Sequence, residues 1–279
     1  MLESTFQIAA GIGPSRERRL WAAGIARWED LSSTVDAALP ASADGALRMA
    51  IVEARGALHA RDADRLAGML PAREHWRMFP CFGADAAYLD IETGDDDAAF
   101  AGISAIGVCD RDGPRLFLAG RDLHLFPERA QSWAMLVTFN GLAFDVPILR
   151  AAFPDWRPPA CHVDLRPVLA RLGHGGGLKS IERAASWLRL GRPDHLARIG
   201  GWDATWLWRR GRQGDRAALR LFAEYNLYDA VNLRTLMAYA YNALADAAPA
   251  PAVRAAAPRV PVPGRGDVLY DVSKILLGL

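Results

Sequence analysis

Two carboxylates stand at alternate positions in the segment YLDIET, as Asp90 and Glu92. Alternate residues of a strand project from one face, so these acids lie side by side, about 7 Å apart. At low dielectric they repel each other unless a cation lies close by. Oxygen ligands favour Mg²⁺ or Mn²⁺, which makes the pair a candidate metal site. A solvated strand edge has the same pattern, and the motif taken alone favours that structural alternative.

Two later segments carry further groups suited to phosphate chemistry. LVTFNGLAFDVPIL predicts a strand, a turn at Asn140 and Gly141, and a helix with Asp145 in its first turn, where the helix dipole favours a carboxylate. AEYNLYDAVNL predicts a helix on which Tyr225 and Asp229, four residues apart, share a face. That face can hold a metal-binding carboxylate and a phenol over one reacting phosphate. An ordinary helix-start acid and an ordinary amphipathic helix explain each segment separately.

These motifs are set in strands that come first and helices that follow. The strand-like runs are AAYLDIET, GISAIGVCD, RLFLAG and MLVTFNG. The helical patterns are FDVPILRAAF, LKSIERAASWLRL, WDATWLWRRG and a long one from Asp215 to about Asp246. This order predicts an α/β fold, with a mixed sheet flanked by helices.

The order and types of the five residues resemble the proofreading-type 3′-to-5′ exonucleases, which carry four acids and a tyrosine. More narrowly, DIET, FNGLAFDVPIL, HVDL, LKSIE and EYNLYDAVNL are similar to the YprB-type branch of this ribonuclease-H-like superfamily, over most of residues 86 to 240. The resemblance implies a ribonuclease-H-like sheet and a site that holds two Mg²⁺ or Mn²⁺ ions. Its catalytic residues would be Asp90, Glu92, Asp145, Tyr225 and Asp229.

The resemblance also implies a role for each residue. Asp90 would bridge the two metals, Glu92 and Asp229 would complete one of them, and Asp145 would hold the second through water. Paired metals stabilise the attacking and leaving oxygens of a phosphodiester. Tyr225, with an ordinary pKa of about 10, is better suited to orient the metal-activated water than to act as a free base.

The amino-terminal segment is a candidate for nucleic-acid binding. A short helical pattern ends near Ala10, a Gly-Ile-Gly turn follows at 11–13, and a second helical pattern begins at Pro14, a residue favoured at the first helical position. Free N–H groups at this helix start suit a phosphate, together with the neighbouring Arg16, Arg18 and Arg19. The segment resembles one helix-hairpin-helix element, and simple packing is an equal alternative.

Other substrate contacts are expected from aromatic and basic residues. Trp202, Trp206 and Trp208 lie beside Arg209, Arg210 and Arg212, a combination on which single-stranded nucleic acid stacks. The helical spacing of Trp202 and Trp206 favours core positions for both, so Arg209 and Arg210 are the better candidates. Phe144 and Phe153 are also expected in the core.

Single polar residues near the motifs are more ambiguous. Lys179 is expected to meet a substrate phosphate, with a solvated helix-start lysine as the alternative. Asn140 is placed near the substrate strand by the resemblance. His162 and Asp164, in CHVDL, suit the rim of the site and equally a hydrogen-bonded histidine and a helix N-cap.

The composition of the 279 residues limits the classes of protein that the sequence can encode. Hydrophobic residues make up 51% and charged residues 23%, values typical of a globular protein. No apolar run has the length of a membrane span, so we expect a cytoplasmic protein without membrane contact. Cys81, Cys109 and Cys161 fit neither a disulfide framework nor a zinc site. The net charge of +1 does not by itself indicate nucleic-acid binding.

The chain is predicted to have five parts. They are a helix-hairpin-helix-like module (1–35), a helical bridging segment (36–79), the ribonuclease-H-like exonuclease domain (80–246), an Ala/Pro linker (247–266) and a C-terminal tail (267–279). The predicted function is a metal-dependent 3′-to-5′ exonuclease of single-stranded DNA or RNA. Two alternatives are a nucleic-acid-binding module without cleavage, because fold does not fix function, and a structure-specific endonuclease that uses the same metals. No motif indicates a protein partner.

Overall fold

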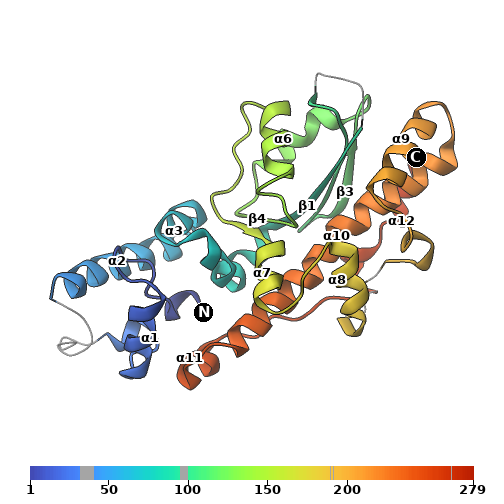
Figure 1. Ribbon diagram of the computed structural model, residues 1–279. Helices are drawn as coiled ribbons and strands as arrows, with labels where there is room; N and C mark the ends of the chain where they lie inside the picture. The colour runs from blue at the N-terminus through green and yellow to red at the C-terminus, as the bar shows by residue number, and fades with distance from the viewer. Residues whose placement is uncertain (32–40, 95–99, 189, 191, 265) are drawn as a thin grey trace.

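The computed structural model describes residues 1–31, 41–94, 100–188, 190, 192–264 and 266–279. Its centre is one five-stranded sheet in the order β3-β2-β1-β4-β5 (Figure 1). Pairing is antiparallel between β1 and β2 and between β2 and β3, and parallel from β1 to β4 and from β4 to β5. The strands are β1 (Ala86–Thr93), β2 (Ile103–Asp110), β3 (Gly113–Leu118), β4 (Met135–Thr138) and β5 (His162–Asp164). The mixed sheet expected from the sequence is therefore confirmed.

Helices cover both faces of the sheet, because alternate strand residues are apolar on each side. Leu89, Ile91 and Phe117 belong to one buried cluster, together with residues of α5 (Phe126–Ala130) and α6 (Asp145–Ala152). The opposite face packs against α10 (Arg216–Asp246), flanked by α7 (Leu165–Arg171), α8 (Leu178–Ala184) and α9 (Gly201–Arg212). Asp90 and Glu92 belong to this second face, since they alternate with Leu89 and Ile91.

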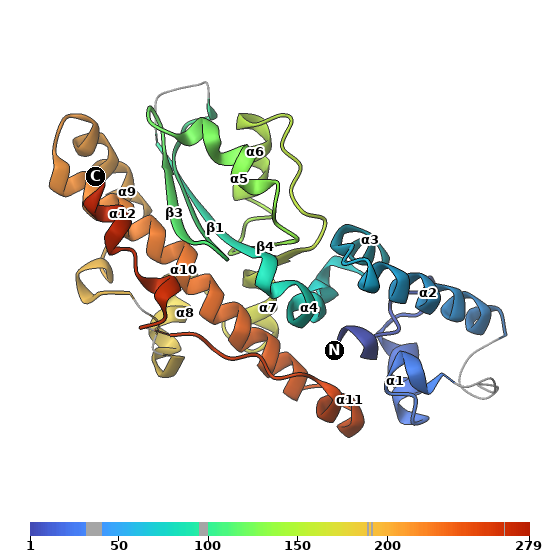
Figure 2. The same cartoon turned by 180° about the vertical axis from the view of Figure 1, so that it is seen from behind.

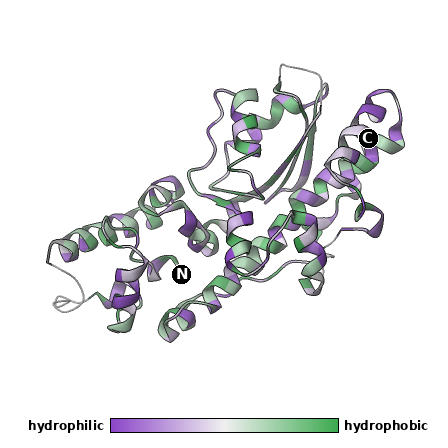
Figure 3. Cartoon of the chain, in the orientation of Figure 1, coloured by the Kyte–Doolittle hydropathy of each residue, from purple (hydrophilic) through white to green (hydrophobic). Residues whose placement is uncertain are grey.

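The long helix α10 is the main support of the site. Its first turn is capped by Asp215, whose carboxylate accepts a hydrogen bond from the backbone N–H of Ala218 at 3.0 Å. Hydrophobic and hydrophilic residues both occur along its length (Figure 3), and its middle is buried on most sides because the sheet, α9 and the last part of the chain pack around it. Both predicted ends of this helix agree with the structure. Among the described residues, no helix is long and apolar enough to cross a membrane.

The amino-terminal part differs from the expected pair of helices. The chain has a 3-10 turn at Leu2–Ser4 and only turns up to Gly11, and the helix α1 (Pro14–Ala22) begins at the predicted proline. The carboxylate of Glu17 accepts hydrogen bonds from Thr5 Oγ1 (2.6 Å), Phe6 N (3.0 Å) and Gln7 Nε2 (2.8 Å). This buried carboxylate holds the first segment in an irregular conformation, so the first helix of the hairpin motif is absent.

The bridging segment is broken into several short helices instead of one. They are α2 (Ala41–His59), α3 (Ala63–Met69), a 3-10 helix (Ala72–Met78) and α4 (Phe79–Phe82). The break after α2 occurs at Arg61, which has a φ of +54°, and at Asp62, whose side chain caps α3. The predicted boundary at residues 35 and 36 lies outside the described residues.

After α10 the chain turns and runs back along this helix (Figure 2). A short helix, α11 (Pro251–Ala256), follows α10, and Asn242 of α10 exchanges two hydrogen bonds with the backbone of Val260. The 3-10 helix Val268–Tyr270 and α12 (Ser273–Leu277) then pack beside β3. Buried Val253 and Tyr270 show why the segment docks, since each covers apolar surface of its own chain. The three cysteines, all within the described residues, are free.

Candidate active site

Three carboxylates from two elements converge above the sheet. Asp90 and Glu92 project from β1, and Asp229 reaches them from α10, which crosses this face. One oxygen of each acid lies within 4.8 Å of an oxygen of each of the others. Asp90 and Glu92 are partly exposed, while Asp229 is buried. The expected convergence of strand and helix acids is therefore present.

A glycine lets α10 approach this part of the sheet closely. Gly107 lies opposite Asp90 in the antiparallel pair β1–β2. A Cβ atom at Gly107 would lie 2.5 Å from Oδ1 of Asn226 on α10, too close for any real contact. The same Asn226 donates from Nδ2 to Oδ2 of Asp90 at 2.9 Å. The missing side chain at position 107 thus allows the helix to orient Asp90.

Gly107→Ala is expected to lower the free energy of unfolding by about 1–3 kcal/mol, because overpacking forces the helix or the amide to move. Chemical denaturation of the wild type and the variant measures this change. The double variant Gly107→Ala with Asn226→Ala should lose less stability than the sum of the two single changes, since the obstructing amide is gone. Strictly additive losses would contradict a clash at this contact.

The fourth acid of the expected set, Asp145, lies next to the other three but outside their close group. It occupies the first turn of α6 and is buried, and its Oδ1 accepts a hydrogen bond from the backbone N–H of Ile91 at 3.1 Å. Ile91 stands between Asp90 and Glu92 in β1. Asp145 therefore braces the strand that carries two of the acids.

Lys179 and Arg192 contact Asp229, but no cation pairs with Asp90, Glu92 or Asp145 among the described residues. Removal from water, followed by repulsion from Asp229, Asp145 and Glu92, raises the pKa of Asp90 well above its usual range. Burial first and repulsion from Asp229 second raise the pKa of Glu92 to about 8. Burial also raises the pKa of Asp145 to about 7. A set of close carboxylate oxygens with uncompensated charge fits a hard divalent cation such as Mg²⁺ or Mn²⁺.

Tyr225 lies one helical turn before Asp229, beside a lysine. The Nζ of Lys179, from α8, donates a hydrogen bond to the Tyr225 hydroxyl and lies 3.9 Å from the centroid of its ring. The same Nζ is 3.6 Å from Oδ2 of Asp229. Burial, together with the nearby carboxylates of Asp229, Glu92 and Asp90, raises the pKa of Tyr225 well above its ordinary value. The phenol therefore keeps its proton at neutral pH.

Arg192 is a member of the site that the motifs did not reveal. Its guanidinium is shared between Asp229 and Glu182, with Nε 2.7 Å from Oε2 and Nη2 3.0 Å from Oε1 of Glu182. Asn232 donates to Glu182 at 2.8 Å. The two carboxylates raise the pKa of Arg192 further, although burial acts the other way. Arg192 lies in a stretch without any motif, so only the tertiary structure brings it to Asp229.

The tryptophans of α9 are placed differently from the expectation. Trp202 is 92% exposed and Trp206 is 54% exposed, so the prediction of core positions was wrong for both, while Trp208 is buried. Arg210 lies 4.8 Å from the ring centroid of Trp206 and pairs with Asp215, and Arg209 is exposed. These residues form a basic and aromatic outer surface on α9.

That surface lies close to the acidic group. Thr205 of α9, between the two exposed tryptophans, packs against Gly94, where an added Cβ would lie 2.8 Å from the Thr205 methyl carbon. Gly94 comes directly after β1 and two residues after Glu92. The helix that carries the exposed tryptophans therefore lies beside the end of the strand that carries Asp90 and Glu92.

The loop before Asp145 contributes a second apolar surface. Phe144 is 44% exposed, so its expected core position was also wrong, while Phe153 is buried as expected. Leu142 of the same loop is exposed. The turn before them is tight, with a φ of +67° at Asn140 and with Gly141 packed directly on Thr138.

His162 and Asp164 have structural roles at the neighbouring strand ends. His162 is buried and hydrogen-bonded to Oγ1 of Thr138 at 2.8 Å, and burial lowers its pKa to about 4. Asp164 caps α7 and accepts the backbone N–H of Asn140 at 2.8 Å. The side-chain oxygen of Asn140 accepts a hydrogen bond from Arg166 at 2.8 Å. Asn140 is thus held at the end of β4, and its contact with substrate stays a prediction.

The three arginines of the amino-terminal module are not brought to the acids. They belong to α1, which lies apart from the sheet (Figure 1). Arg16 donates to the carbonyl oxygen of Gly11, and Arg18 lines a cavity between this module and the rest of the chain. The module and the acidic site are therefore separate candidates for contact with nucleic acid.

A comparison with models of known protein families identifies the superfamily to which the chain belongs. The model of the RNase_H_2 family, within the RNase H superfamily, matches residues 87–241, more than half of the chain. The chain belongs to the RNase H superfamily. The match spans every element that carries an acid of the site, and the mixed sheet agrees with an RNase H-like fold. Neither the curated proteins nor the solved structures that were searched contain a match.

Membership of the RNase H superfamily gives the site its general chemistry. It indicates a hydrolase of phosphodiester bonds that acts on nucleic acid. The group of Asp90, Glu92 and Asp229 lies within the matched residues and could hold a divalent metal.

Proposed function

We propose that this RNase H superfamily protein is a metal-dependent 3′-to-5′ exonuclease that hydrolyses single-stranded DNA or RNA. The observation that carries the proposal is the convergence of Asp90, Glu92 and Asp229, with Tyr225 one turn away on the same helix. The direction of hydrolysis is supported by the order of the acidic motifs and by Tyr-x-x-x-Asp, which are similar to those of the proofreading-type exonucleases.

Each residue has a part that follows from its contacts. Asp90, Glu92 and Asp229 would hold divalent cations, which when bound lower the pKa of water and stabilise charge on the phosphate. Asp145 is the proposed fourth acid, tied to the backbone between the two strand acids. The protonated Tyr225 hydroxyl donates a hydrogen bond to the attacking water or to the phosphate, and Lys179 orients the phenol.

Incubation with end-labelled single-stranded and duplex DNA and RNA in Mg²⁺ or Mn²⁺ tests the proposed function. We expect products that shorten one nucleotide at a time from the 3′ end of single strands. Label placed at the 5′ end makes this ladder visible, and label at the 3′ end should appear as mononucleotide. Internal fragments without a ladder would establish an endonuclease instead. Binding without cleavage of any substrate would overturn both.

The exposed tryptophans are expected to bind the bases of the single strand. Trp202→Ala and Trp206→Ala should each weaken binding by about 1–3 kcal/mol, since base stacking on an aromatic ring has this magnitude. Fluorescence anisotropy with a labelled 12-nucleotide strand in chelator measures Kd without cleavage. Trp187→Ala, at another exposed tryptophan that packs on Tyr239, is the matched control. Equal losses at all three positions would contradict stacking on α9.

A further inference from the structure

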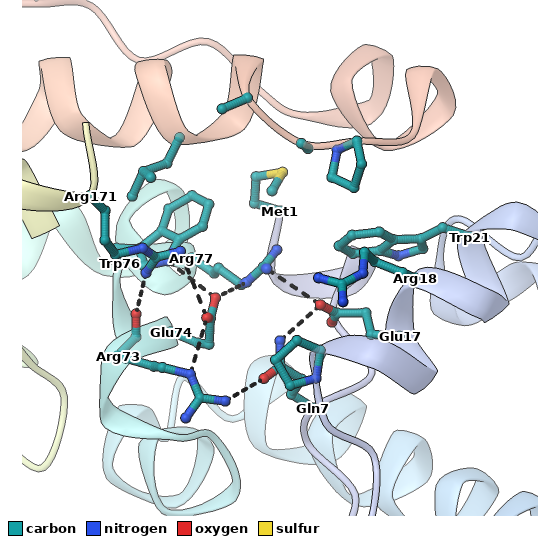
Figure 4. Close-up of a pocket in the computed structure, with 15 residues that line it drawn as sticks. Met1, Gln7, Glu17, Arg18, Trp21, Arg73, Glu74, Trp76, Arg77 and Arg171 are labelled. Atoms are coloured by element: carbon teal, nitrogen blue, oxygen red, sulfur yellow. Dashed lines mark hydrogen bonds and ion pairs between the residues drawn. The ribbon is translucent and has the colours of Figure 1, made fainter. Parts of the chain in front are cut away.

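A cavity of about 350 Å³ lies between the amino-terminal module and the RNase H-like part of the chain. Figure 4 shows side chains from the amino-terminal module and the bridging segment directed into it, beneath the end of α10. Its walls carry four arginines and two glutamates, which are Arg18, Arg73, Arg77, Arg171, Glu17 and Glu74. The cavity therefore has two positive charges in excess.

The floor of the cavity is a closed set of ion pairs. Arg77 is buried between Glu74, at 2.7 Å, and Glu17, at 3.5 Å, and lies over the ring of Trp76. Trp76 also donates to Glu74 at 3.2 Å. One buried guanidinium serves two buried carboxylates, so the floor keeps one negative charge in excess, and the positive excess of the cavity comes from its rim.

The rim carries three exposed arginines from three separate elements. Arg18 comes from α1, Arg73 from the 3-10 helix Ala72–Met78, and Arg171 from the last turn of α7. Arg18 makes no hydrogen bond or ion pair with any residue that the structure describes. Arg73 donates one hydrogen bond to Oε1 of Gln7 and Arg171 donates one to the carbonyl oxygen of Arg73, both at 3.1 Å. The two arginines lie 3.7 Å and 3.9 Å from Glu74, distances too long for strong pairs. Each guanidinium has five N–H donors, so the rim keeps donors available for a ligand.

We propose that this cavity binds a phosphate group, held by Arg18, Arg73 and Arg171. Guanidinium forks match phosphate oxygens, and charge-assisted hydrogen bonds of this kind are the strongest available at a half-open site. The phosphate belongs either to the backbone of a bound nucleic acid or to a free phosphate or nucleotide. The first of these sources rests on the proposed function. The chemistry of recognition is the same in both.

The distance between the acidic site and the cavity sets the minimum length of a nucleic acid that can contact both. Leu244 lines the cavity and follows Asp229 by fifteen residues in the same helix. At a rise of 1.5 Å per residue the two positions are about 22 Å apart. A stacked strand with a spacing of 3.4 Å covers this distance with roughly six or seven nucleotides, and an extended strand covers it with fewer. A dinucleotide is too short to occupy both places.

Arg18→Ala and Arg55→Ala form a matched pair for the test. Both arginines are exposed on helices of the amino-terminal half, and Arg55, on α2, does not line the cavity. The first arm measures binding of inorganic phosphate to each full-length variant by calorimetry. The second arm measures binding of 2-nucleotide and 16-nucleotide DNA in chelator over a range of salt concentrations. Melting temperatures of both variants verify that the fold is kept.

We expect Arg18→Ala, and not Arg55→Ala, to weaken phosphate binding about tenfold. On the 16-nucleotide strand, Arg18→Ala should lower the slope of log K against log salt by about 0.7, with a smaller change on the 2-nucleotide strand. A changed slope supports the backbone source, and phosphate binding with an unchanged slope supports a free phosphate or nucleotide. Equal behaviour of the two variants in both arms would overturn the site. Absence of hydrolysis by the wild type would overturn only the proposed function, since neither arm requires cleavage.

Discussion

Asp90→Asn is expected to reduce phosphodiester hydrolysis by about a thousandfold or more while leaving the protein folded. The loss follows because the central carboxylate of the metal-binding group becomes a neutral amide, and metal-held charge in a transition state is worth several kcal/mol. The fold should persist because the asparagine oxygen can still accept the hydrogen bond from Asn226. Initial rates on a 5′-labelled single strand in Mn²⁺ give the measurement.

The control for Asp90→Asn is an acid of similar chemistry far from the site. Glu128→Gln changes an exposed carboxylate of α5, on the opposite face of the sheet, and should leave the rate within twofold. In chelator, Asp90→Asn should melt at or above the temperature of the wild type, because repulsion among the acids is relieved. Activity of Asp90→Asn close to that of Glu128→Gln would remove Asp90 from the proposed chemistry.

The second large effect is expected on the free energy of unfolding, which should depend on pH and on bound metal. In the metal-free protein the pKa values of Glu92 and Asp145 are about 8 and about 7, above the unfolded values of about 4.3 and 3.9. Between these limits the folded state binds more protons than the unfolded state. The free energy of unfolding of the metal-free protein therefore falls as the pH rises from about 4 to about 8.

Bound metal should restore the stability that is lost at high pH, because the metal binds the carboxylates in their deprotonated form. At a metal concentration of about one hundred times Kd, we expect Mn²⁺ to raise Tm by roughly 5–10 °C at pH 8. The shift should shrink steadily toward pH 5, where protons compete for the same oxygens. Thermal unfolding in Mn²⁺ and in chelator across this range provides the measurement.

Asp90→Asn is also the control for this second prediction, because it keeps the fold and removes a ligand. Its Tm should respond weakly to Mn²⁺ at every pH. A metal-induced shift that is equal at pH 5 and pH 8, or as large in Asp90→Asn as in the wild type, would place the metal elsewhere on the chain.

Local spacing in the sequence was sufficient to predict the acids of the site and the elements that carry them. Asp90 and Glu92 share a face because strand side chains alternate, and Tyr225 and Asp229 share a face because they are one helical turn apart. Pro14 and Asp215 marked the starts of two helices through local backbone chemistry. These features depend on neighbours along the chain, so the type and order of the main elements could be predicted without the tertiary structure.

Features that depend on contacts between distant segments could not be predicted in this way. Trp202 and Phe144 have sequence patterns of core residues, yet no other element covers them. The first turns of the chain are irregular because Glu17 holds Thr5 and Gln7, which outweighs their local helical pattern.

The site itself shows the same division between local and long-range information. The sequence by itself determined which carboxylates share a strand or helix face, because backbone periodicity is a local property. Only the tertiary structure decided that α10 packs on the sheet over Gly107 of β2, that Arg192 reaches Asp229, and that Asp145 stays beside the close group of three acids. Those outcomes depend on how closely two packed elements approach, and that distance is set by side chains far apart in the sequence.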